Sequence, residues 1–107
     1  MSDENMRPTV PTGQNIDYQE NSVVSKTIIN RPGGTVTLFA FDHGQGLSEH
    51  TAPYDAMVYV LEGKVEIRIA GQVSILNQGQ YIVMPADDPH ALMALEPFKM
   101  LLVMIKS

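Results

Sequence analysis

Histidines are the residues of this chain best suited to chemistry, and there are three of them, His43, His50 and His90. Imidazole binds transition metals, and because it titrates near neutral pH it also serves as a general acid or base. The chain contains no cysteine, so disulfides, thiolate nucleophiles and cysteine-bound zinc or iron–sulfur clusters are excluded. A strong metal site would therefore have to use histidine, carboxylate or methionine donors.

His43 lies in the turn-like sequence Asp42-His43-Gly44, and we expect it to be a surface residue without a role in chemistry. Tyr54 follows the His50 segment and is the better candidate for a pocket residue, whereas Tyr59 lies within an expected strand and should pack. Five methionines fall in the strand-rich region. They could supply soft sulfur ligands for copper, but we favour core or pocket lining. These residues are Met57, Met84, Met93, Met100 and Met104.

The elements that must position these residues are strands. In residues 64–69 the apolar side chains alternate with charged ones, which is the period of a strand with one buried face. A turn at residues 70–72 and a second alternating segment at 73–75 predict a hairpin. Further strands are expected at 23–29, 35–41, 47–51, 57–61, 81–84, 91–95 and 98–105. Eight or nine short strands between Gly- and Pro-rich breakers predict an all-β barrel or sandwich.

The length of 107 residues indicates a single domain. Residues 1–16 are polar and contain two prolines at positions 8 and 11, so we expect a flexible leader. The folded barrel is then expected to span residues 17–107.

Charge and hydropathy exclude several classes of partner. The formal net charge is −5 and the seven Lys and Arg residues are scattered, which argues against nucleic acid. No apolar run approaches the length of a membrane span, and the acidic N-terminus does not resemble a signal peptide. We therefore expect a soluble cytoplasmic protein.

Two segments match spaced motifs of a known family. In the first, Gly44 is followed after five residues by His50, and Gly63 closes the segment. In the second, Gly79 is followed after five residues by Pro85, and then by His90. The chain resembles the cupin family over roughly residues 22–105, since these offsets match its two motifs without insertions. The resemblance implies the cupin jelly roll, a double-stranded β-helix barrel.

The family's metal-binding members hold one divalent ion with two histidines and a glutamate from the first motif and a histidine from the second. The resemblance places His50 and His90 at two of these positions, whereas Ala52 and Ala56 occupy the other two. It therefore implies a pocket in which His50 and His90 bind a divalent transition metal, Fe, Mn, Ni or Zn. Without metal, the same pair could act as a general acid and base, or be satisfied by hydrogen bonds.

A third ligand could come from Asp55, one residue before the missing carboxylate position. Strand parity predicts that Ser48 and Ala52 share the inward face of His50. Asp55 would then need a bulge near Pro53-Tyr54 to turn inward and complete a two-histidine, one-carboxylate site. We name Tyr54, Asp55 and Met84 as expected residues of a substrate pocket.

Two functions remain open at this point. One is a small metalloenzyme that oxidises, isomerises or cyclises a small organic molecule. The other is a metal-free binding or sensing domain with a degenerate metal site. In either case we expect a homodimer, because a small barrel must protect its edge strands and residues 23–29 could pair with a second copy.

Overall fold

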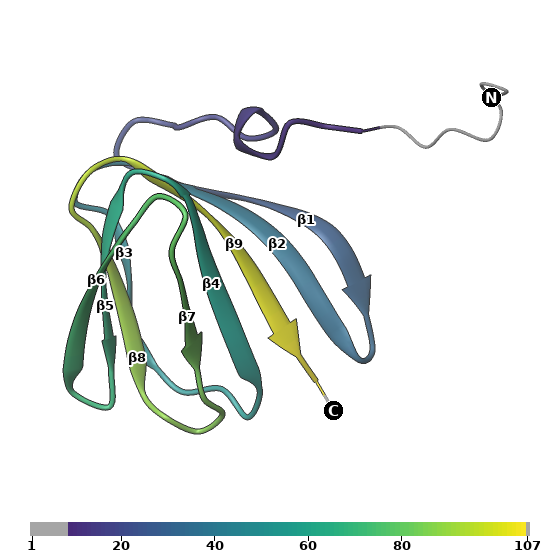
Figure 1. The fold of residues 1–107 in the computed structure, drawn as a ribbon, viewed down its shortest axis with the longest axis vertical. Coiled ribbons are helices and arrows are strands. Elements are labelled where there is room, and N and C mark those ends of the chain that lie inside the picture. Colours follow the sequence, from purple (N-terminus) through teal and green to yellow (C-terminus); the bar gives the residue numbers. More distant parts are fainter. Residues whose placement is uncertain (1–8, 107) are drawn as a thin grey trace, which may run out of the picture.

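The protein is described by a computed structural model that covers residues 9–106 (Figure 1). The chain forms nine strands in this range: β1 (Val23–Arg31), β2 (Gly34–Phe41), β3 (Gly46–His50), β4 (Asp55–Glu62), β5 (Lys64–Ile69), β6 (Gln72–Asn77), β7 (Tyr81–Met84), β8 (His90–Ala94) and β9 (Phe98–Ile105). Helix in the described residues is limited to a single 3-10 turn, Thr12–Gln14, so none of it is long or apolar enough to cross a membrane.

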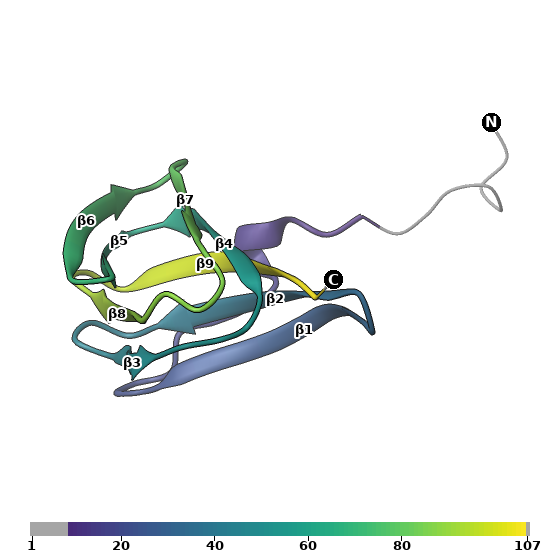
Figure 2. The ribbon, with the colours of Figure 1, turned by 90° about the horizontal axis from the view of Figure 1, so that it is seen from below.

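The strands form two antiparallel sheets that face each other (Figure 2). The larger sheet has the order β1-β2-β9-β4-β7 and the smaller one β3-β8-β5-β6. The last strand, β9, lies between β2 and β4, so the middle of this sheet is formed by contacts between distant parts of the sequence. This arrangement confirms the predicted all-β cupin barrel.

Alternating side chains explain why the β5–β6 hairpin forms where it does. Val65 and Ile67 are fully buried, and the charged residues that alternate with them, Lys64, Glu66 and Arg68, point to the other face. The turn residues Ala70 and Gly71 both have positive φ, 49° and 81°, as in the tight turns that match the twist of a hairpin.

The core lies between the two sheets. Phe41 and Phe98 are fully buried and stack with ring centroids 4.6 Å apart at the end of β2 and the start of β9. Close packing at this end requires Gly63, because a Cβ there would lie 2.1 Å from the carbonyl oxygen of Pro97. Gly63 also has a φ of +85°, which disfavours other residues.

The outer face of the larger sheet is covered by the segment that precedes β1. Ile16 is buried there against Leu38 and Ala40 of β2. Of residues 1–16, which we expected to form a flexible leader, residues 1–8 lie outside the described part of the chain and residues 9–12 are exposed. Ile16 packs against the barrel because the outward face of β2 is itself apolar.

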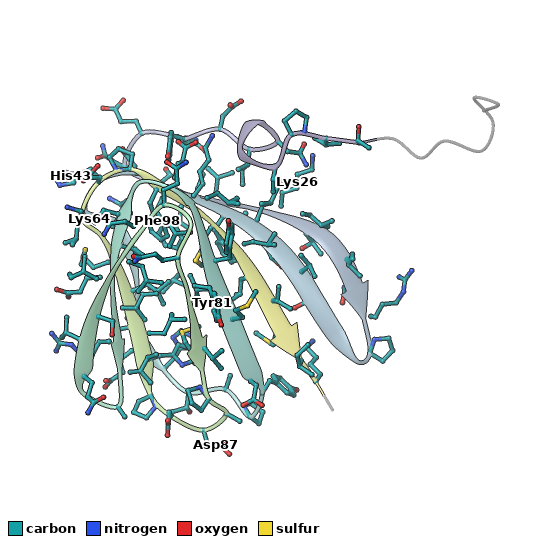
Figure 3. All side chains as sticks on the ribbon, in the orientation of Figure 1. Lys26, His43, Lys64, Tyr81, Asp87 and Phe98 are labelled. Atoms are coloured by element: carbon teal, nitrogen blue, oxygen red, sulfur yellow. The ribbon has the colours of Figure 1, made fainter. Side chains whose placement is uncertain are left out.

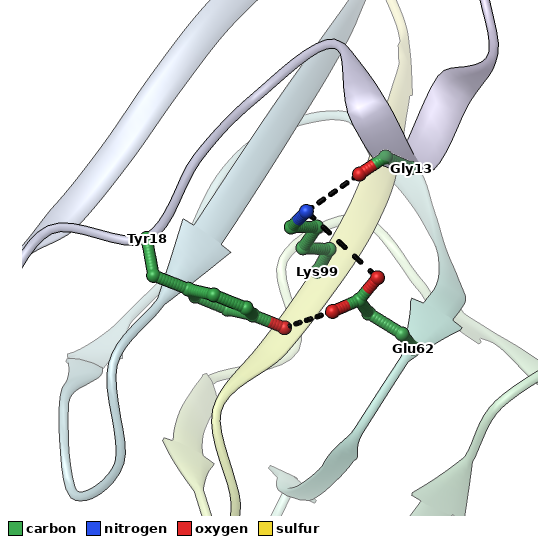
Figure 4. A network of polar contacts seen from close by, with 4 residues as sticks. All are labelled: Gly13, Tyr18, Glu62 and Lys99. Atoms are coloured by element: carbon green, nitrogen blue, oxygen red, sulfur yellow. Dashed lines mark hydrogen bonds and ion pairs between the residues drawn. The ribbon is translucent and has the colours of Figure 1, made fainter.

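Polar contacts hold the same segment in place (Figure 4). The ammonium group of Lys99 donates a hydrogen bond to the carbonyl of Gly13 and lies 3.8 Å from Oε1 of Glu62. Tyr18 donates its hydroxyl to Oε2 of Glu62 over 2.6 Å, and its ring lies 5.0 Å from the Lys99 ammonium. Lys99 is only 7% exposed, so these partners compensate a buried charge.

Candidate functional site

The two histidines of the family motifs meet at one end of the barrel. His50 is the last residue of β3 and His90 the first of β8, and the two are direct register partners in the smaller sheet. This end carries the loop with Asp87, whereas the exposed His43 lies at the opposite end (Figure 3). His43 is therefore a surface turn residue, as expected.

Each imidazole is held by a backbone carbonyl on one side and by the other imidazole on the other side. Nδ1 of His50 lies 2.8 Å from the carbonyl oxygen of Ser48, and Nδ1 of His90 lies 3.2 Å from that of Asp88. The two Nε2 atoms lie 3.0 Å apart, with the rings at 72° to each other. All four ring nitrogens are thus within hydrogen-bond distance of a partner.

A count of protons shows that this arrangement is one proton short. A carbonyl oxygen only accepts, so each Nδ1 must carry a hydrogen to bond Ser48 or Asp88. A neutral imidazole carries one hydrogen, which leaves both Nε2 atoms as lone-pair acceptors facing each other over 3.0 Å. The pair is therefore satisfied only when a proton, a hydrogen-bond donor or a cation sits between the two nitrogens.

Burial opposes a positive charge on the inner histidine. His90 is only 5% exposed, and desolvation lowers its pKa, with a smaller lowering from the nearby His50. The hydrogen bond to the carbonyl of Asp88 acts in the opposite direction, toward a higher pKa. His50 is exposed and forms the solvent side of the pair.

A small cavity adjoins the two histidines inside the barrel. The cavity has a volume of about 50 Å³, which is enough for a few water molecules, an ion or a small chemical group. Apart from the histidines its wall is apolar, with two alanines, three leucines and three methionines. They are Leu47, Ala52, Ala56, Met84, Leu92, Met100, Leu102 and Met104.

Strand parity gave a wrong prediction for the face of Ser48. The β3–β8 register shifts between Leu47 and His50, so a bulge lies at this point of β3. Leu47 and His50 both line the inner cavity as a result, and Ser48 lines a groove on the outside of the barrel. The bulge thus lies before His50, whereas an inward Asp55 would have required a bulge after it, near Pro53-Tyr54.

Of the residues expected in the substrate pocket, the structure brings Met84 to the histidines and places the other two outside the cavity wall. Asp55 is exposed, and its Oδ1 accepts a hydrogen bond from the backbone N–H of Ala86 over 2.9 Å. The ring of Tyr54 lies 5.6 Å from the ammonium group of Lys106. The two-histidine, one-carboxylate site is thus absent from the described geometry.

Of the cavity residues on β9, the sequence had indicated core or pocket lining for Met100 and Met104, whereas Leu102 had not been named. Met100, Leu102 and Met104 alternate along this strand, so the period of two could have placed them on one inward face. Within residues 9–106, no group of three histidine, aspartate or glutamate side chains could hold a metal ion. The donors available around the cavity are therefore the two imidazoles and the methionine sulfurs.

A broader open groove of about 490 Å³ lies on the outer face of the smaller sheet. Its polar and charged lining residues, among them Glu49, Glu66 and Arg68, are on the opposite side of the sheet from the histidines. We place the candidate site in the smaller inner cavity, because the Nε2 atoms of His50 and His90 meet beside it.

The two sheets form a small jelly-roll barrel, and the histidine-lined cavity lies between them at one end. The sequence profile of the cupin domain matches residues 37–105. The chain therefore belongs to the cupin family.

Solved structures of similar proteins agree with this assignment. A conserved protein of unknown function from Streptococcus pyogenes is 38% identical, with a TM-score of 0.91 over 95% of this chain and 90% of that one. A cupin superfamily protein from Desulfitobacterium hafniense is 25% identical, with a TM-score of 0.90 over 95% and 94% of the two chains.

A curated relative has a name that refers to an activity. The chain is 27% identical over 94 residues to a protein of Streptomyces cyaneus named polyketide synthase CurC. The match covers 81% of this chain and 61% of that protein, so the chain spans less than two thirds of the relative's length.

Proposed function

We propose that this cupin binds a transition-metal ion through Nε2 of His50 and His90, and that one chemical group of a small organic molecule enters the cavity beside the ion. The observation that carries the proposal is the proton count. Two neutral imidazoles present their free lone pairs to each other over 3.0 Å, and a bound cation satisfies both at once. Bonds of about 2.0–2.1 Å from one ion to each nitrogen can span this separation.

The residues present fit part of the family's usual metal shell. His50 and His90 would hold the ion, while the alanines at positions 52 and 56 leave the remaining positions to water or to the organic ligand. Such an open shell is a property of catalytic rather than structural metal sites. When bound, an ion of the expected set, Fe, Mn, Ni or Zn, would supply Lewis-acid chemistry toward an oxygen of the ligand.

The protein itself would orient the two imidazoles and the ligand, and its apolar wall would exclude water. The carbonyls of Ser48 and Asp88 fix which nitrogen of each imidazole carries the hydrogen, so that both Nε2 atoms face the cavity. The leucine and methionine wall would hold the apolar part of a ligand. The likeness to a protein named polyketide synthase supports an enzymatic role, in which oxidation, isomerisation or cyclisation would suit such a site.

A second function is favoured by the apolar cavity wall. Without metal, a ligand hydroxyl or amine could donate the missing hydrogen to the two Nε2 atoms, with its apolar part against the leucines and methionines. The protein would then be a binding or sensing domain rather than an enzyme.

Metal analysis of the purified protein separates these functions. We expect close to one transition-metal ion per chain after reconstitution with Fe, Mn, Ni or Zn, and loss of the ion in the His50→Ala/His90→Ala variant. His43→Ala is the matched control, because this histidine lies at the other end of the barrel. A wild-type protein that stays free of metal after reconstitution would favour the metal-free function.

A further inference from the structure

The carboxylate position of the family motif is replaced here by a small residue between two methionines. Ala56 of β4 pairs directly with Met84 of β7 on one side and with Met104 of β9 on the other. Directly opposite residues of antiparallel strands share one face of the sheet, with Cβ atoms about 4.5–5.5 Å apart. All three residues line the cavity beside the histidines.

Burial shows that this arrangement is part of the inner wall. Met84 is 3% exposed and Ala56 is 6% exposed, so both side chains point away from bulk solvent. An alanine side chain leaves space on this face, and the long, unbranched methionine side chains beside it are flexible enough to reach into that space. The volume that a glutamate would fill is therefore accessible to thioether sulfur.

The donor set of the cavity is soft. It contains two imidazole nitrogens and three methionine sulfurs, and none of its lining residues is a carboxylate. Oxygen-rich sites suit Mg²⁺, Ca²⁺ or Mn²⁺, whereas thioether ligands select Cu(I) and imidazole suits copper as well. A monovalent ion also carries a smaller desolvation penalty in an apolar cavity than a divalent one, since that penalty rises with charge.

We infer that this barrel is a copper(I) site, in which the thioether sulfur of Met84 or Met104 joins Nε2 of His50 and His90. The inference rests on the proposed function, because it names the ion that the histidine pair takes. It makes a softer ion the preferred one over the divalent ions expected from the family resemblance. The sequence had offered methionine mainly as lining, and the register with Ala56 is what gives two of these residues a place beside the histidines.

The test is a titration with Cu(I) alone, under anaerobic conditions with ascorbate, in competition with a chromophoric Cu(I) chelator. Zn(II) binding is measured separately by calorimetry on the same preparations. The variants are Met84→Leu/Met104→Leu, which keeps the apolar volume without sulfur, and His50→Ala/His90→Ala. Met93→Leu is the matched control, since Met93 is 43% exposed and does not line the cavity. Thermal unfolding establishes that each variant is folded.

We expect one Cu(I) per chain in the wild type and in Met93→Leu. Affinity should fall at least about tenfold in the double methionine variant, the lower end of the losses seen when metal-site partners are removed. Zn(II) affinity should be unchanged by the methionine substitutions. X-ray absorption of the Cu(I) protein should show a sulfur scatterer that is lost in the same variant.

Other results overturn the inference in distinguishable ways. Cu(I) binding that depends on the histidines but not on the methionines would remove sulfur from the site and leave the proposed function standing. If Zn(II) binds but Cu(I) does not bind in competition with the chelator, the copper(I) inference fails and the proposed metal function stands. If neither ion binds the folded wild type, the proposed metal function fails together with the inference.

Discussion

The carboxylate of Asp55 accepts a hydrogen bond from the backbone N–H of Ala86, with 2.9 Å between Oδ1 and the nitrogen. This contact joins the first residue of β4 to the loop that leads into His90. A residue that seemed suited to bind a metal instead helps to hold the loop on which a candidate ligand depends.

Asp55→Ala should therefore loosen this loop without removing any residue of the cavity wall. Loss of one such hydrogen bond should lower the free energy of unfolding by about 1 kcal/mol. Asp55→Asn keeps an acceptor oxygen and should stay close to the wild type. Urea unfolding measures the stability, and amide hydrogen exchange at residues 86–90 measures the loosening. Equal stability of the alanine and asparagine variants would contradict a structural role for this contact.

Ala56→Glu should restore a carboxylate next to the histidine pair. The added oxygen donor should raise affinity for Zn(II) or Mn(II) by about tenfold or more, equivalent to about 1.4 kcal/mol. The metal-free variant should be less stable than the wild type, because the new carboxylate is buried without a partner. Calorimetry with each ion measures the gain. As a control, Val83→Glu places a carboxylate at an exposed position of the neighbouring strand.

Because of Tyr18, the free energy of unfolding should decrease as the pH rises into the alkaline range. Burial, then the hydrogen bond and the negative charge of Glu62, raise the pKa of the Tyr18 phenol above its ordinary value near 10. The neutral phenol is thus favoured in the folded state, so its contribution is complete below about pH 10 and is lost as the pH rises toward the folded-state pKa.

The measurement is the urea midpoint at pH 8 and at pH 10.5 for the wild type and for Tyr18→Phe. The wild type should lose more stability than the variant over this interval, because only the wild type carries the phenol of Tyr18. An equal loss would show that the phenol of Tyr18 does not contribute.

Gly63→Ala should be far more harmful than Gly71→Ala, although both glycines have positive φ, +85° and +81°. A left-handed residue other than glycine costs about 1–2 kcal/mol, and both variants share this cost. At Gly63 the new Cβ would also meet the backbone at Pro97 and Phe98, whereas nothing lies within 4 Å at Gly71. Thermal unfolding of the two variants checks the difference, and equal melting temperatures would contradict it.

We expect the protein to be a homodimer that pairs through β1. In the described residues β1 is one of the two edges of the larger sheet and pairs only with β2, and its exposed Ile28 and Ile29 leave apolar surface uncovered. Light scattering should give the mass of two chains for the wild type and of one chain for Ile28→Lys/Ile29→Lys. Val73→Lys is the control, because this exposed residue lies on β6 of the other sheet. A single-chain mass for the wild type would end the proposal.

Local sequence was sufficient to predict the strands. All nine strands overlap the predicted ranges, and those of β5, β7 and β9 agree at both ends, 64–69, 81–84 and 98–105. The reason is that alternation and turn formation depend on neighbours in the chain. The offsets of His50 and His90 within the two motifs also anticipated that they would meet, since they resembled those of a known family.

Only the tertiary structure determined which side chains of distant strands surround the two histidines, because this depends on the register between those strands. The bulge in β3 put Leu47 on the same side as His50, and the pairing of β4 with β7 and β9 put methionines beside Ala56. The backbone carbonyls that hold each Nδ1 likewise belong to a particular loop conformation. Alternation along a strand shows which of its residues share a face, but only the pairing of distant strands determines which residues of different strands meet on that face.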